Sequence, residues 1–215
     1  MKTRLTLLAF ALSCAAAPAG AFDFGNIGKL LDTVTKVKAA TTELAEPQEI
    51  ELGEGVASNL LGAAPLLKKP ALQQYVNQGG LWLALQTERP DLPWRFGVLD
   101  DDNINAFATP GGNILITNGL LQRMSNEAEL AGVLAHEIAH VLKKHHLEAI
   151  KKNARTSLLT DVAVQAADRK GRNPAIAKLA GAGTELYARG LDKDDEFEAD
   201  RMGVVIAARA GYDPF

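Results

Sequence analysis

Hydrophobic residues recur along this chain with two different periods, and the change of period divides it into predicted elements. In the first part they recur every three to four positions, as in amphipathic helices. The predicted helices cover residues 27–45, 51–61 and 71–86. Pro47 is expected to end the first of them, because a proline inside a helix removes a hydrogen bond. Three short runs with the composition of strands follow, and their spacing predicts a small antiparallel meander. These runs cover residues 95–100, 104–108 and 113–117.

Beyond Gly119 the pattern is helical again, without an internal repeat or a low-complexity tract. The predicted helices cover residues 126–146, 149–168, 174–188 and 192–210. Most of the chain is therefore expected to be helix around one sheet. This is an α+β fold, mainly helical, with a small antiparallel sheet.

The first 21 residues have the three parts of a secretory signal peptide. Lys2 and Arg4 precede the apolar run 5–13, and small residues stand at the expected cleavage site, 19–21. The mature protein is therefore expected to be exported. The alternative is a lipoprotein anchored through Cys14, although Ala11 stands where the lipidation motif usually has leucine.

Composition and charge exclude several classes of protein. The chain has 215 residues, with 23 Lys and Arg against 26 Asp and Glu. Cleavage after Ala21 removes two basic residues, so 21 face 26 and the net charge is −5. An acidic chain with few aromatic residues does not suit a nucleic-acid groove. Cys14, the only cysteine, lies in the leader, which excludes disulfide scaffolds, cysteine proteases and Cys-ligated zinc. No later stretch reaches the roughly 20 apolar residues that cross a bilayer.

The helix expected over residues 126–146 carries polar groups where a buried helix normally has none. All but three of the residues 130–142 are apolar, alanine or glycine, and the exceptions are His136, Glu137 and His140. The two histidines lie about 40° apart on one face. Burying the unpaired carboxylate of Glu137 would cost on the order of several kcal/mol. A zinc ion explains all three residues, because two imidazoles one turn apart can bind it while the glutamate reaches its water.

A catalytic zinc takes a third protein ligand, and two segments compete for that role. His146 stands where the metzincin pattern HExxHxxGxxH has its last histidine, but Lys143 replaces the glycine that turns the chain there. On a continuing helix His145 and His146 are expected to face solvent. Glu196 and Asp200 lie one turn apart on a helix face that otherwise carries small residues and can approach another helix closely. We therefore place Glu196 on the metal and Asp200 behind it, hydrogen-bonded to a ligating histidine or to the backbone.

Together these motifs resemble a known family. The chain from about Glu49 to Pro214 is similar to the zinc metallopeptidases that include the HtpX heat-shock peptidase and the CAAX prenyl protease. It is most similar to their soluble, exported bacterial branch, the BepA-like proteases. The shared stretches are NAFA at 105–108, PGG at 110–112, GLL at 119–121, HEIAH at 136–140, and EFEAD at 196–200 followed by Gly203.

The resemblance implies an organisation of the chain. A signal peptide over residues 1–21 and a helical segment over 22–48 precede a zincin-type metallopeptidase domain over 49–215. Members of the family normally continue past the Gly-Tyr-Asp-Pro turn, here 211–214, so the domain is expected to be truncated at its C-terminus.

The resemblance also implies the chemistry and the partners. His136, His140 and Glu196 would hold one Zn²⁺ per chain, with Glu137 as the catalytic glutamate and Asp200 as the paired acid. The expected activity is cleavage of misassembled or damaged proteins of the cell envelope, in periplasmic quality control, by a water that zinc and Glu137 activate. Nucleic acid is not an expected partner, and peripheral membrane association is compatible with the sequence.

Several interpretations stay open at this point. A substrate is expected to lie along residues 113–117 as an added strand, and the competing interpretation is an ordinary sheet edge. Residues 171–190, with Gly181 and Gly183, form either a lid over the cleft or a plain packed helix. The alternative to a peptidase is a zinc-stabilised chaperone or binding module that cleaves nothing, and a weaker alternative is a metal-dependent hydrolase of non-peptide bonds. No residue that stabilises the oxyanion is identified.

Overall fold

The computed structural model describes residues 43–160 and 191–213, and of residues 154–160 the backbone alone. The predicted signal peptide, Cys14, nearly all of the helix expected over 27–45, and the segment 171–190 lie outside the described residues. The described elements, in chain order, are α2 (Glu46–Ala63), α3 (Pro70–Ala84), β1 (Arg95–Leu99), β2 (Ala106–Thr109), β3 (Asn113–Thr117), α4 (Asn118–Leu121), α5 (Glu127–Leu142), α6 (His145–Thr160) and α8 (Lys193–Arg209). Within these residues no helix combines the length and the apolarity that crossing a membrane requires.

α2 begins earlier than its hydrophobic pattern predicts. Pro47 stands in the first turn of α2, and the helix that it is expected to end lies almost wholly outside the described residues. The first N–H groups of a helix have no partner within it, so a proline there removes no hydrogen bond. The side chain of Gln48 closes this end by accepting a hydrogen bond from the backbone N–H of Ala45 at 3.1 Å.

The three strands form a mixed sheet in the order β1-β3-β2, and not the predicted antiparallel meander. β2 and β3 are antiparallel, joined by a tight turn in which Gly111 and Gly112 both have positive φ. β1 is parallel to β3 because the loop 100–105 crosses the end of β3 before β2 begins. Thr117, the last residue of β3, holds this loop by donating its hydroxyl hydrogen to the carbonyl of Asn103 at 2.6 Å. β3 is therefore the central strand.

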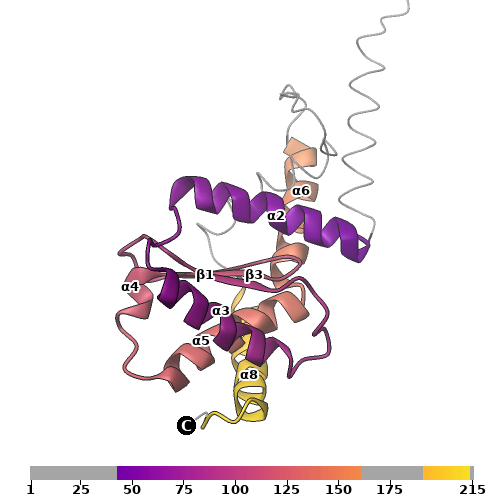
Figure 1. Ribbon diagram of the computed structural model, residues 1–215. Coiled ribbons are helices and arrows are strands. Elements are labelled where there is room, and N and C mark those ends of the chain that lie inside the picture. The colour runs from indigo at the N-terminus through magenta and orange to yellow at the C-terminus, as the bar shows by residue number, and fades with distance from the viewer. Residues whose placement is uncertain (1–42, 161–190, 214–215) are drawn as a thin grey trace, which may run out of the picture.

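Helices cover both faces of this sheet (Figure 1). α2 lies on one face, and α3 and α5 lie on the other. Successive residues of β3 alternate between the two cores, since Leu115 packs with α2 while Ile114 and Ile116 pack with α5. A strand buried on both faces reads as a continuous apolar run, which explains why its bounds match the prediction.

A buried carboxylate joins α2 to two distant parts of the fold. Glu49 is fully buried, and its oxygens lie 2.9 Å from Nη1 of Arg89 and 3.3 Å from Nζ of Lys144. Arg89 belongs to the loop after α3. Lys144 lies between α5 and α6 and has a positive φ of 60°. Glu49 therefore holds the turn at which the chain leaves α5.

Glu49→Ala is expected to lower the free energy of unfolding by about 2–3 kcal/mol, because the mostly buried Arg89 loses its main partner. Arg89 keeps a 3.0 Å contact with the exposed Glu46, which limits the loss. Urea unfolding followed by circular dichroism measures the change. The matched control is Glu54→Ala, which breaks an exposed pair with Arg95 and should cost no more than about 1 kcal/mol. Equal losses in the two variants would contradict a stabilising role for the buried pair.

Candidate metal centre

The N-terminus of α5 is fixed by a reciprocal cap. Oδ1 of Asn126 accepts a hydrogen bond from the backbone N–H of Glu129 at 2.9 Å, and the Glu129 carboxylate accepts one from the N–H of Ser125 at 2.8 Å. Such a cap satisfies N–H groups that have no partner within the helix. The helix starts where its sequence predicts.

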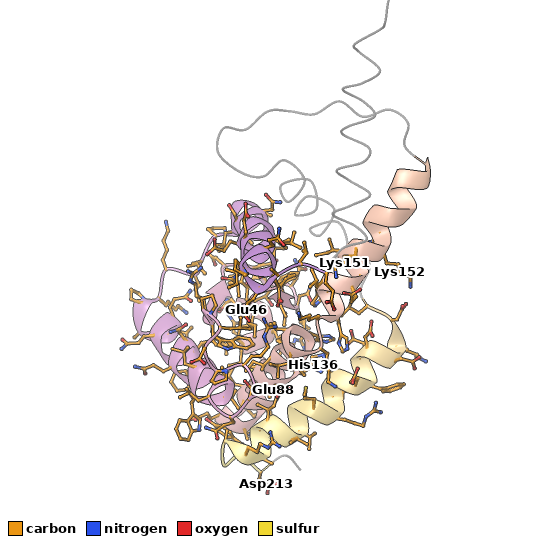
Figure 2. The ribbon with its side chains drawn as sticks, turned by 90° about the vertical axis from the view of Figure 1, so that its right-hand side faces the viewer. Glu46, Glu88, His136, Lys151, Lys152 and Asp213 are labelled. Carbon is orange, nitrogen blue, oxygen red and sulfur yellow. The ribbon has the colours of Figure 1, made fainter. Side chains whose placement is uncertain are left out.

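α8 lies against α5 along a face of small residues, as the sequence predicts. Ala199 and Ala207 are buried, and a Cβ atom at Gly203 would stand 3.0 Å from the backbone nitrogen of His136. The two helices are thus in close contact beside His136 (Figure 2). Because Glu196 lies two turns before Gly203 on the same face, this approach brings its carboxylate to the histidines.

Three side chains from these two helices converge. The Nε2 atoms of His136 and His140 are 2.9 Å apart, and the carboxylate oxygens of Glu196 lie 3.5 Å and 3.8 Å from them. Ligand atoms on a tetrahedral zinc, with bonds of about 2.0–2.1 Å, stand roughly 3.3 Å from one another. The observed distances bracket that value. Within the described part of the chain this is the one group of three such side chains with converging ligand atoms.

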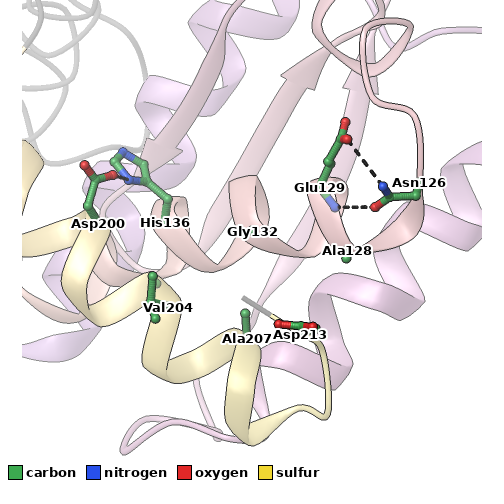
Figure 3. Close-up of a pocket in the computed structure, with 10 residues that line it drawn as sticks. Asn126, Ala128, Glu129, Gly132, His136, Asp200, Val204, Ala207 and Asp213 are labelled. Atoms are coloured by element: carbon green, nitrogen blue, oxygen red, sulfur yellow. Dashed lines mark hydrogen bonds and ion pairs between the residues drawn. The ribbon is translucent and has the colours of Figure 1, made fainter. Parts of the chain in front are cut away.

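Asp200 contacts the same site from behind His136. Its Oδ1 lies 2.8 Å from Nδ1 of His136 (Figure 3). A carboxylate can only accept a hydrogen bond, so Nδ1 carries the proton and Nε2 keeps its lone pair for a cation. Asp200 is therefore where the sequence argument places it, one turn beyond Glu196 and against a histidine of the site.

The electrostatics of the site suit a divalent cation. Burial raises the pKa of the Glu137 carboxyl to about 8, and the carboxylate of Glu196 raises it as well. Burial is the main cause that lowers the pKa of His140 to about 2, and three neighbouring histidines lower it further. His140 is therefore neutral at physiological pH, the form in which imidazole binds zinc. The carboxylate of Glu196 disfavours a second negative charge on Glu137, and the residues present fit a zinc ion that would compensate both charges.

His145 and His146 are not the solvent-facing residues of a continuing helix that the sequence predicts. α5 ends at Leu142, and the positive φ of Lys144 turns the chain before α6 begins. His145 is buried, with its Nδ1 atom 2.9 Å from Nδ1 of His140. Burial also lowers the pKa of His146 to about 3. The break falls at two lysines and contains neither glycine nor proline, so no local signal in the sequence marks it.

β3 cannot accept a peptide as an added strand, contrary to the prediction, because β1 and β2 already pair with its two sides. It is not an ordinary sheet edge either. The outer side of β1 is covered as well. The side-chain amide of Gln73 bonds to the N–H and the carbonyl of Val98, each at 2.8 Å, and Asn77 accepts from the N–H of Phe96 at 3.0 Å.

An open groove of about 500 Å³ lies between α5 and α8 (Figure 3). His136 and Asp200 line it beside the metal centre, and Asn126 lines it at the start of α5. Small side chains, among them Gly132 and Ala207, leave room between these points. Sequence analysis alone does not find this groove, since the residues on its two walls are more than 60 positions apart in the sequence.

The chain is also similar to known proteins. The model of peptidase family M48 matches residues 70–215. The beta-barrel assembly-enhancing protease of Escherichia coli K12 is 34% identical over 181 residues, which are 82% of this chain and 37% of that protein. The putative beta-barrel assembly-enhancing protease of Vibrio cholerae is 34% identical over 183 residues, 81% of this chain and 37% of its own length.

A plant mitochondrial protein is similar over a shorter stretch. The mitochondrial metalloendopeptidase OMA1 of Arabidopsis thaliana is 32% identical over 124 residues, 57% of this chain and 24% of that protein. The chain thus spans a little over a third of the length of its bacterial relatives and less of the plant one. Since the family model covers most of the sequence, from α3 through the candidate metal centre to the end, the chain belongs to peptidase family M48.

Proposed function

We propose that this chain is a zinc-dependent endopeptidase that cleaves misassembled or damaged proteins of the bacterial cell envelope. The observation that carries the proposal is the convergence of His136, His140 and Glu196 beside the buried carboxyl of Glu137. A helix with only a structural role gains nothing from polar side chains buried in this arrangement, whereas a metallopeptidase needs a cation site and a base next to it.

Each residue of the site has a separate role in this proposal. His136, His140 and Glu196 would hold the ion, and a bound zinc would supply a Lewis acid that polarises the peptide carbonyl and acidifies a water. Glu137 takes the proton of the attacking water on its carboxylate and delivers it to the leaving amine. The pKa of about 8 belongs to the metal-free site, and the positive charge of a bound cation would favour the ionised carboxylate that acts as the base. Asp200 fixes the ring of His136 and its protonated Nδ1.

The groove between α5 and α8 is the place we propose for the substrate. It opens beside His136, and its small side chains leave space for an extended chain. The beta-barrel assembly-enhancing proteases lend support for substrates among envelope proteins, by their name and their similarity over most of this chain. The predicted signal peptide supports export to the periplasm, with anchoring through Cys14 as the alternative.

Removing the metal tests the proposal. The purified chain is expected to contain one zinc ion, measured by atomic emission spectroscopy, and to cleave casein. Treatment with 1,10-phenanthroline should remove both the zinc and the cleavage, and added zinc should restore them. Cleavage by metal-free protein, or an absence of stoichiometric zinc in protein prepared without chelators, would overturn the assignment.

A further inference from the structure

The two histidines of the candidate centre meet different groups on their outer sides. Nδ1 of His136 contacts the carboxylate of Asp200, whereas Nδ1 of His140 lies 2.9 Å from Nδ1 of His145. His145 is buried, and its other ring nitrogen, Nε2, lies 3.2 Å from Oε2 of Glu198. A continuous series of contacts therefore leads from His140 through a second imidazole to a carboxylate of α8.

The positions of the protons in this series follow from the proposed metal binding. When Nε2 of His140 donates its lone pair to a cation, the proton of the neutral ring is on Nδ1. That N–H donates to Nδ1 of His145, which must then be unprotonated. The neutral His145 ring consequently carries its own proton on Nε2, where it faces an acceptor, the Glu198 carboxylate. Each donor thus meets an acceptor.

The break between α5 and α6 is what allows this contact. On a continuing helix His145 would lie about 140° around the axis from His140 and could not reach its Nδ1. Lys144 interrupts the helix with a φ of 60°. Its ammonium group is held by the carboxylate of Glu49. Lys143, on the other side of the break, pairs with Glu198 at 2.8 Å. The residues that turn the chain therefore also hold the carboxylate that His145 uses.

We propose that His145 is a positioning residue of the zinc centre. Its Nδ1 atom accepts a hydrogen bond from His140, and its Nε2 atom donates one to the carboxylate of Glu198. This inference rests on the proposed zinc site and adds a member to it that has no part in binding the ion directly. By fixing the tautomer and the ring plane of His140, His145 raises the affinity for zinc.

Two substitutions separate positioning from packing. His145→Leu keeps an apolar side chain in the buried space but removes the acceptor, and zinc affinity is expected to fall about 10–100-fold. His145→Asn places Oδ1 near the position of Nδ1 and should retain zinc affinity within about 5-fold of the wild type. Competition with a chromophoric chelator measures the affinities. The visible spectrum of the Co²⁺-substituted protein should change in the leucine variant and stay close to wild type in the asparagine variant.

Leu147→Ala is the control for a loss of packing alone. Leu147 is buried in the core under α2, away from the candidate ligands, so its truncation should lower stability while leaving zinc affinity and the cobalt spectrum unchanged. If His145→Leu binds zinc as tightly as the wild type, or if His145→Asn loses as much affinity as His145→Leu, the proposal is wrong. A wild-type protein that binds no zinc would instead refute the proposed function.

Nitrogen-15 NMR of the zinc-loaded wild type tests the same point without any substitution. The chain has four histidines, so the ring signals are few enough to assign. The proposal requires a proton on Nδ1 of His140 and on Nε2 of His145. A proton on Nδ1 of His145 would overturn it even if the leucine variant fails to fold.

Discussion

Replacing Glu137 by glutamine is expected to leave zinc bound and to lower the rate of peptide cleavage by about 10²–10⁴-fold. Glutamine has nearly the shape of glutamate, but its neutral amide cannot take a proton from water. The side chain of Glu137 is not one of the three that converge as ligands, so the ion should stay. Zinc content and kcat/KM on a quenched fluorescent peptide, measured on the same preparation, give both quantities.

The same substitution also has a thermodynamic signature. With a pKa of about 8 in the folded, zinc-free protein against an ordinary value of 4.5, Glu137 binds a proton more tightly in the folded state than in the unfolded one. The stability of zinc-free protein should therefore fall as the pH rises from about 4.5 to 8, and Glu137→Gln should weaken that dependence. Urea unfolding at several pH values measures the slope.

The control for both experiments is Glu54→Gln, which makes the same chemical change at an exposed position of α2. It should alter neither cleavage nor the pH slope. If Glu137→Gln lost the zinc, Glu137 would be a ligand rather than the base. If the variant cleaved peptides as fast as the wild type, its proposed role would be wrong. A chain that binds zinc but cleaves nothing would fit a zinc-stabilised binding module, in which this substitution leaves biological activity intact.

Gly203→Val is expected to remove zinc binding and to destabilise the fold by about 3 kcal/mol. A Cβ atom at this position would already lie 3.0 Å from the backbone nitrogen of His136 and 3.1 Å from its Cα atom, and the two further methyl groups of valine have no space between the helices. Backbone atoms within a helix cannot move aside cheaply, so α8 must shift away from α5. Glu196 travels with α8, which opens the ligand set. Zinc titration and urea unfolding measure the two effects.

Gly132→Val provides the matched control. Gly132 is a glycine within α5, one turn before His136, and a Cβ atom there would meet nothing within 4 Å. The helix propensities of valine and glycine differ by only a few tenths of a kcal/mol, so stability and zinc affinity should both stay near the wild type. Similar zinc affinities for Gly203→Val and Gly132→Val would show that the close approach of the two helices does not determine the site.

Local patterns in the sequence determine much of the secondary structure of this protein and the spacing of its candidate metal ligands. The strand bounds of β3, the cap of α5 and the helical spacing of His136 and His140 depend on residues within a few positions of one another, and such patterns are visible in a single chain. The small-residue face of α8 also indicates a close helix neighbour, which is why the amino-acid pattern alone predicts Glu196 beside the histidines. A carboxylate in an otherwise apolar helix predicts a cation site before the tertiary structure is known, because a buried negative charge needs a compensating positive one.

Only the tertiary structure decided the order of the strands, the break after α5 and the groove. β1 lies beside β3 because a loop is bonded to Thr117 across the end of the sheet, and the turn at Lys144 is held by Glu49, nearly a hundred residues earlier. These contacts join residues that no short window contains, and the lysines at the break carry no intrinsic preference for a positive φ. His145 meets His140 for that reason alone. The chain's own periodicity specified which residues were available for a metal centre, and long-range packing specified how they are supported.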